Sequence, residues 1–266
     1  MIENVINEFE YNNFRSKWNE KLLATFPEYE SEVINFISDE KLWLKHSFEV
    51  YKKALYLKWN ISDDNIEELV IEYLAIFHDI WKFFQELHSL ENISIAENVF
   101  KIFAERNWIN QNIIEKVLDW IKWSDFYNYR LDPSSNPPKF IEWDIVRCSD
   151  KMQDNLVAKV DRYWFEYWVP RWAIFYDGNI KLEEREKFSF DNFLWDQLNV
   201  ILSIIWLRKE DFSNNFLSQE YEKWSIPEKE KVIVRILELA KEIWYNENEL
   251  EKIKDIITWY RKKFNC

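Results

Sequence analysis

Residues 68–82 read ELVIEYLAIFHDIWK, an apolar run that ends in the adjacent residues His78 and Asp79. The stretch from Leu69 to Phe77 is nearly all apolar, which predicts a buried helix. Upstream, Asp64 and Glu67 resemble a capping box, which predicts the start of that helix. A carboxylate at the end of a buried helix is costly unless a positive charge lies nearby. The pair of His78 and Asp79 is therefore the first candidate for a functional site.

Most of the remaining chain has helical periodicity as well. Over residues 41–58, Val50, Ala54 and Leu57 form one apolar stripe, and His46 extends this stripe toward the N-terminus. Further helices are predicted over residues 15–37 with an interruption at Pro27, and over residues 94–106, 111–122, 140–160, 190–206, 227–243 and 247–264. The sequence therefore predicts an all-α fold.

One segment departs from this helical pattern. Asp177 and Gly178 lie between flanks that alternate in polarity, so residues 173–182 are predicted to form a short β-hairpin. A loop is predicted over residues 132–139, where proline, serine and asparagine cluster. We therefore expect a helical protein with one small hairpin in its C-terminal part.

The composition excludes several classes of protein. The chain has 266 residues, with 35 lysines and arginines against 48 aspartates and glutamates, which gives a net charge of −13. This balance argues against a partner such as duplex nucleic acid, which attracts clustered positive charge. The sequence predicts no membrane span, and Cys148 and Cys266 make no disulfide framework. We therefore expect a cytoplasmic protein that does not enter a membrane.

Asp150 adds a further carboxylate, on the inward face of the helix predicted over residues 140–160. Imidazole and carboxylate groups together suit one divalent metal ion, such as Mn, Fe, Zn or Mg. A single buried histidine is more often a hydrogen-bonded core residue than a metal ligand. The adjacency of His78 and Asp79 nevertheless favours a metal site.

The order of these residues resembles the HD-domain superfamily of metal-dependent phosphohydrolases, whose pattern is H…HD…D. The matching residues are His46 in KHSFEV, His78 and Asp79 in IFHDIWK, and Asp150 in IVRCSDKM. The resemblance implies an HD-domain helical bundle that holds one metal ion through these four side chains. It also implies hydrolysis of a phosphoester by metal-activated water.

The same resemblance sets the expected division of the chain. Residues 1–39 are expected to form an N-terminal helical segment, and residues 40–170 the HD-type metal-binding core. Residues 171–266 are expected to form the hairpin and a C-terminal helical extension packed on that core. The sequence leaves open whether the protein forms a homo-oligomer.

The chain departs from the family pattern in its histidines. HD proteins with two or three metals carry extra histidines between the HD pair and the last aspartate. Here the matching stretches read SIAE over residues 94–97 and KWSD over residues 122–125. The remaining histidine, His88, lies in a predicted loop and is expected to be a polar surface residue. A site with a single metal ion is therefore favoured.

Four residues are candidates for acting on a substrate. Asp79 is the candidate catalytic residue, because it can accept a hydrogen bond from water or act as a base. Lys82 matches the lysine of the HDIGK form of the motif and is expected to contact a phosphate oxygen, unless it is a solvated lysine at the helix end. Arg147 and Lys151 flank Asp150 and are further candidates for binding an anionic substrate, unless they are solvated or support the ligands.

Two functions follow from these residues. The first is a metal-dependent phosphohydrolase that cleaves a phosphoester of a nucleotide or of a small phosphorylated metabolite. The alternative is a non-catalytic HD-fold module that binds a nucleotide or a partner protein. The missing histidines favour this alternative.

The chain has one glycine and 16 tryptophans. Several tryptophans end helical runs, where a residue with positive φ favours glycine. We interpret most of them as UGA codons that the natural translation reads as glycine, and the alternative is an aromatic core rich in tryptophan. The expected glycine positions are Trp43, Trp59, Trp81, Trp108, Trp120, Trp123, Trp168, Trp172, Trp206 and Trp244. Positive φ is expected at Trp59, Trp108, Trp206 and Trp244, whereas Trp18 and Trp195 lie mid-helix and fit genuine tryptophans.

Overall fold

The computed structural model describes most of the N-terminal half of the chain and four helices of the C-terminal half. The described residues are 8–38, 43–61, 63, 65–78, 90–123, 140–153, 156–163, 212, 214–243 and 247–264. Their regular secondary structure is helical throughout, which confirms the all-α prediction. The predicted hairpin over residues 173–182, the loop over 132–139 and the helix over 190–206 lie outside the described residues.

The chain divides into two compact units, residues 1–153 and residues 154–266. The predicted core of residues 40–170 extends past this boundary, and the expected division into three segments stays a prediction. None of the described helices combines the length and the apolar character needed to cross a bilayer.

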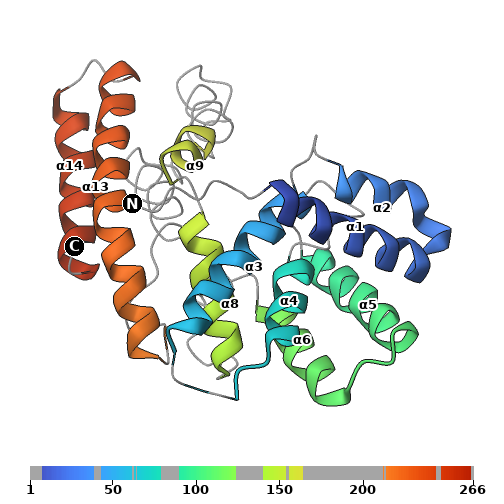
Figure 1. The fold of residues 1–266 in the computed structure, drawn as a ribbon. Helices are drawn as coiled ribbons and strands as arrows, with labels where there is room; N and C mark the ends of the chain where they lie inside the picture. The colour runs from blue at the N-terminus through green and yellow to red at the C-terminus, as the bar shows by residue number, and fades with distance from the viewer. Residues whose placement is uncertain are drawn as a thin grey trace. The chain divides into compact units, whose positions relative to one another are not determined.

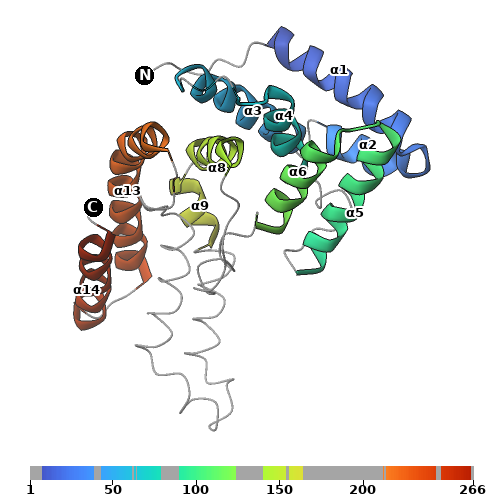
Figure 2. The same ribbon diagram turned by 90° about the horizontal axis from the view of Figure 1, so that it is seen from below.

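Unit 1 is built around three helices that pack on one another, α3, α4 and α8 (Figure 1). Helices α5 and α6 form a hairpin against α4, and α1 packs on α3 (Figure 2). The described helices of this unit are α1 (Glu8–Thr25), η1 (Pro27–Tyr29), α2 (Glu30–Ile37), α3 (Trp43–Trp59), α4 (Glu68–Phe77), α5 (Leu90–Arg106), α6 (Gln111–Trp123) and α8 (Ile141–Gln153). The predicted interruption at Pro27 is confirmed, since proline lacks the N–H that would continue α1.

Helix α4 lies in the core of unit 1, as its apolar sequence predicts. Seven consecutive side chains from Ile71 to Phe77 are buried, whereas Leu69 in the first turn is 44% exposed. The helix begins after Glu67, whose side chain makes no capping hydrogen bond, and Asp64 lies outside the described residues. The buried helix is confirmed, but its predicted start is wrong, because Glu67 is extended and directly precedes the first helical residue, Glu68, so it is not the third residue of a helix that starts after Asp64. The Glu67 side chain instead accepts a hydrogen bond from Lys116.

Trp18 of α1 fills the centre of an aromatic cluster against α4. Its side chain is fully buried, and its Nε1 donates a hydrogen bond to Glu72 Oε1 over 2.9 Å. The rings around it belong to Phe14, Tyr73, Phe77 and Phe103. Both the ring and the indole N–H are used, so this position suits a genuine tryptophan.

Helix α3 runs in the opposite direction to α4. Its first turn, with His46, lies near the end of α4, whereas Tyr51 and Lys58 further along α3 contact Glu68 at the start of α4. The predicted apolar stripe of α3 is confirmed, because Val50, Ala54 and Leu57 are all fully buried. This packing brings the histidine that extends the stripe to the end of α4.

The helix predicted over residues 140–160 is wrong in its extent. The structure has two helices there, α8 ending at Gln153 and α9 (Leu156–Tyr163). Residues 154 and 155, which lie between them, are outside the described residues.

Unit 2 contains α9 and the long helices α13 (Asn215–Ile243) and α14 (Glu247–Phe264), which lie side by side (Figures 1 and 2). Arg235 of α13 pairs with Asp161 of α9 over 2.7 Å. The predicted helix start at residue 227 is wrong, because α13 continues through Pro227. Asn214 caps the true start, where its side-chain oxygen accepts hydrogen bonds from two backbone N–H groups.

Trp108 has the backbone of a C-terminal glycine cap. Its φ is 53°, its N–H bonds the Glu105 carbonyl, and the N–H of Ile109 bonds the Ala104 carbonyl. These two bonds define a Schellman motif, in which the residue with positive φ is usually glycine. The Trp108 side chain is 94% exposed and thus gains little from burial. The predicted positive φ is confirmed at this position.

The expectation of positive φ is wrong at Trp59. Among the described non-glycine residues, positive φ occurs at Trp108 alone. Helix α3 instead ends in two successive tight turns, from Asn60 N–H to Leu57 and from Ile61 N–H to Lys58, which need no left-handed residue. The Trp59 ring is 83% exposed, as expected for a tryptophan at a helix end. Trp206 and Trp244 lie outside the described residues.

Candidate metal centre

Three of the four predicted metal ligands converge at one end of the α3–α4–α8 core. His46 lies in the first turn of α3, His78 directly follows α4, and Asp150 lies in the last turn of α8. One ligand atom from each lies within 4.8 Å of the other two. The fourth predicted ligand, Asp79, lies outside the described residues.

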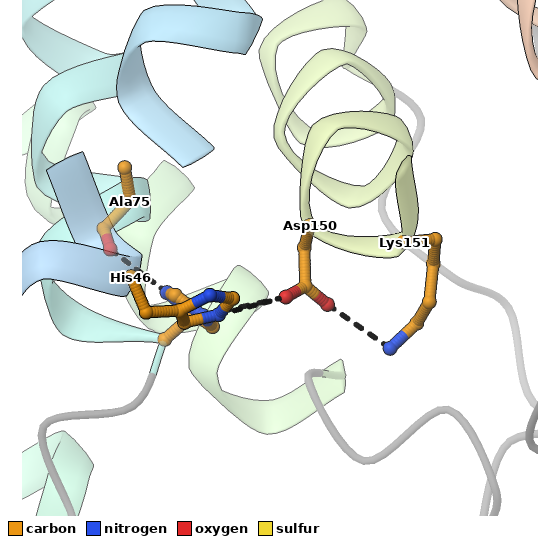
Figure 3. Close-up of polar contacts among 5 residues, drawn as sticks. His46, Ala75, Asp150 and Lys151 are labelled. Atoms are coloured by element: carbon orange, nitrogen blue, oxygen red, sulfur yellow. Dashed lines mark hydrogen bonds and ion pairs between the residues drawn. The ribbon is translucent and has the colours of Figure 1, made fainter. Parts of the chain in front are cut away.

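The three ligand atoms face one another. His46 Nε2 is 3.2 Å from Asp150 Oδ1 and 3.3 Å from His78 Nε2, and His78 Nε2 is 3.7 Å from Asp150 Oδ1. Figure 3 shows the His46 ring directed at one oxygen of the Asp150 carboxylate. Metal–ligand bonds of ~2.0–2.2 Å place ligand atoms about 3–3.5 Å apart. The observed spacings are close to this range, so the residues fit a single ion.

The orientation of His78 is set by the backbone of α4. Its Nδ1 lies 2.8 Å from the carbonyl oxygen of Ala75. A carbonyl only accepts hydrogen bonds, so Nδ1 carries a proton, and Nε2 faces His46 and Asp150. Metal-ligating histidines commonly have such a partner on the other ring nitrogen. The sequence analysis did not predict the role of the Ala75 carbonyl, because every residue type has a backbone carbonyl. The signal that could have found it is that Ala75 lies three residues before His78 in a helix.

The Asp150 carboxylate is held in its ionised form. Burial by itself raises the pKa of this group, but the Lys151 ammonium and the nearby His46 and His78 outweigh burial and hold it well below its usual value. Lys151 Nζ lies 3.0 Å from Oδ2, the oxygen that does not face the histidines (Figure 3). The carboxylate therefore offers one oxygen to a cation while the other is balanced by lysine.

The other predicted site residues differ in their placement. Lys151 lies beside a ligand, as described above. Arg147 is only 3% exposed, pairs with Asp144 over 3.3 Å and stacks its guanidinium over the Trp143 ring. These contacts give Arg147 a role within α8, and its contact with substrate stays a prediction. Lys82 and His88 lie outside the described residues.

Comparison of the chain with protein-family models, with curated proteins and with solved structures finds no match. The helical fold and the group of His46, His78 and Asp150 are compatible with an HD-type site. This compatibility rests on the residues and their geometry alone.

Proposed function

We propose that this protein is a phosphohydrolase that acts with one divalent metal ion. The ligands are His46, His78 and Asp150, with Asp79 as the fourth. The observation that supports the proposal is the spacing of three ligand atoms within 4.8 Å, where two imidazole nitrogens and one carboxylate oxygen face a common point. Such a donor set suits Mn, Fe, Zn or Mg.

The substrate is a phosphoester of a nucleotide or of a small phosphorylated metabolite. When bound, a divalent cation lowers the pKa of water and neutralises charge on phosphoryl oxygens. Lys151 holds an ammonium 3.0 Å from the Asp150 carboxylate, within reach of an anion bound beside that ligand. Lys82 supplies a second positive charge in the proposal, and Asp79 accepts a hydrogen bond or a proton from water.

The residues of the site have separate tasks. His78 is oriented by the Ala75 carbonyl, so its lone pair needs no rearrangement to bind a cation. His46 has Nε2 near both Asp150 and His78, so a proton on this nitrogen satisfies the group when no cation is bound. His46 Nε2 must carry no proton when it binds a cation, so metal affinity is expected to fall at acidic pH, where the ring is an imidazolium.

A second candidate function is a non-catalytic HD-fold module that binds a nucleotide or a partner protein. The observation that favours it is the lack of histidine over residues 94–97 and 122–125. Such a module retains the three-residue group as a structural metal site. Turnover separates the two functions.

The test is hydrolysis of p-nitrophenyl phosphate and bis-p-nitrophenyl phosphate with added Mn²⁺, compared before and after EDTA. We expect Mn²⁺-dependent turnover of at least one ester by the full chain, and its loss in His78→Ala. His88→Ala is the matched control and is expected to keep most activity. Metal-loaded protein that hydrolyses neither ester contradicts the phosphohydrolase and favours the binding module.

A further inference from the structure

A second charged cluster, formed by Glu67, Lys116 and Glu142, lies where α4 and α8 begin. Glu142 is in the first turn of α8 and is only 1% exposed. Its Oε1 accepts a hydrogen bond from the backbone N–H of Glu67 over 3.2 Å. Lys116 of α6 donates to the same oxygen over 2.9 Å and to Glu67 Oε1 over 3.1 Å. The cluster therefore joins three elements of unit 1.

The same two helices carry metal ligands at their other ends. Helix α4 leads from Glu67 to His78, and α8 leads from Glu142 to Asp150. At about 1.5 Å per residue, roughly 16 Å of α4 and 12 Å of α8 separate the cluster from the ligands. The two helices thus run in the same direction, start at one hydrogen-bonded point and end at the metal group.

Metal binding needs the ends of these helices in a fixed register. A slip of one residue along a helix axis moves a ligand by about 1.5 Å, whereas metal–ligand distances tolerate only ~0.2 Å. Side chains packed between α4 and α8 resist sliding along the length of the contact, and a hydrogen bond adds a directional constraint at one point. The contact from Glu142 to the Glu67 backbone fixes the start of α8 against the start of α4 directly.

The charges in the cluster suit this role. Burial alone lowers the pKa of Lys116, but its hydrogen bonds to Glu142 and Glu67 outweigh burial and raise the pKa above its usual value. Lys116 is therefore an ammonium at neutral pH. Its charge compensates the Glu142 carboxylate, which is otherwise costly to bury.

We infer that Glu142 is a positioning residue for the metal centre, which it serves by setting the register of α4 against α8 together with Lys116. The inference rests on the proposed metal site. It assigns a role in metal affinity to residues that touch neither the metal ligands nor the substrate.

The test is titration of the metal-free full chain with Co²⁺, following both affinity and the visible absorption spectrum of the bound ion. We expect Glu142→Ala to weaken Co²⁺ binding by roughly 10–100-fold, the range for residues that orient ligands, and to change the Co²⁺ spectrum. Glu142→Gln keeps an oxygen that accepts the Glu67 N–H and is expected to recover most of the affinity.

Lys116→Met keeps most of the length of the side chain and removes its charge. This variant tests the positioning role if the Glu142→Ala chain does not fold. We expect it to weaken Co²⁺ binding and to alter the spectrum as well. The matched control is Lys101→Met, which removes a lysine from the exposed ion pair with Glu97 on α5 and is expected to leave both unchanged.

The outcomes separate the inference from the site on which it rests. Folded Glu142→Ala and Lys116→Met chains that bind Co²⁺ with the affinity and spectrum of the unaltered chain overturn the positioning role and leave the metal site standing. An unaltered chain that does not bind Co²⁺ overturns both. A lower unfolding temperature with an unchanged spectrum shows a merely structural cluster and also overturns the inference.

Discussion

Helix α4 contributes to two partly buried polar clusters that differ in how their hydrogen-bonding groups are satisfied. The first is the Glu72 cluster, formed by Lys17, Trp18 and Glu72. Here Glu72 Oε1 accepts hydrogen bonds from Lys17 Nζ over 2.5 Å and from Trp18 Nε1 over 2.9 Å. Donors meet an acceptor, and an ammonium balances the carboxylate. This cluster needs nothing further to be stable in the core.

The second group is formed by His46, His78 and Asp150. Two imidazole nitrogens and a carboxylate oxygen face one another within 3.7 Å, and each of these atoms can offer a lone pair to a cation when it carries no proton. The difference teaches that a polar cluster with a fixed donor for its acceptor holds the fold, whereas one in which three possible metal-ligand atoms meet is suited to a cation.

Replacing the carboxylate by an amide is expected to weaken metal binding at Asp150 and to leave it unchanged at Glu72. Asp150→Asn removes an anionic ligand and should weaken Mn²⁺ binding by more than about 100-fold, beyond the cost of losing a supporting residue. Glu72→Gln should leave Mn²⁺ affinity unchanged. Isothermal titration of both variants measures the contrast. Equal losses of Mn²⁺ affinity in the two variants would contradict the assignment of metal binding to the Asp150 cluster rather than to the Glu72 cluster.

Stability should respond at the Glu72 cluster. Glu72→Ala leaves the fully buried Trp18 N–H without its acceptor, which costs about 1–3 kcal/mol of the free energy of unfolding. Lys17 adds little to that cost, because its side chain is 54% exposed and water can solvate its charge. Urea unfolding, monitored by circular dichroism, gives the value. An unchanged midpoint would mean that the hydrogen bond does not hold α1 on α4.

Trp18 and Trp108 extend the comparison to the tryptophans. Trp18 is buried and hydrogen-bonded, whereas Trp108 is exposed and has a φ of 53°. Trp108→Gly should therefore stabilise the chain by roughly 1–2 kcal/mol, the cost of a left-handed residue with a side chain. The gene supplies the decisive observation: UGA at position 108 supports glycine in the natural protein, and UGG there refutes it.

The smallest expected effect is the loss of folding stability at low pH. The pKa of Asp150 is depressed in the folded chain, so its contribution to stability is complete above its ordinary value of 3.8 and is lost as the pH falls through the depressed value. For the metal-free chain, the difference in stability between pH 5 and pH 3 should be larger than in Asp150→Asn by on the order of 1 kcal/mol. Thermal unfolding at the two pH values tests this. Identical pH profiles for both chains would contradict it.

Three of the four predicted ligand residues meet in the structure, because each lies on or directly after a helix whose apolar face can be recognised from the sequence. His46 continues the stripe of Val50 and Ala54, and His78 ends the most apolar run in the chain. Burying those faces leaves few ways to arrange the helices, so the polar groups on them meet. Periodicity does not specify which helices pair, and the contact of Glu142 with Glu67 therefore had no signal in the sequence.

Two other features show where local signals fail. Pro227 is a strong start signal, yet α13 continues through it, since the buried Leu217 and Tyr221 extend its apolar face upstream. Trp108 and Trp59 both end helices, but only α5 ends in a Schellman motif. The type of cap depends on how the following segment leaves the helix, which a single residue does not determine.

The most direct measurement is the amount of Mn²⁺ that the metal-free full chain binds, determined by isothermal titration at pH 7.5 and repeated with His78→Ala. A site built from His46, His78 and Asp150 predicts one ion per chain, with binding lost in the folded variant. A chain that binds no Mn²⁺, or one whose binding is unaffected by His78→Ala, would contradict the existence of this metal centre.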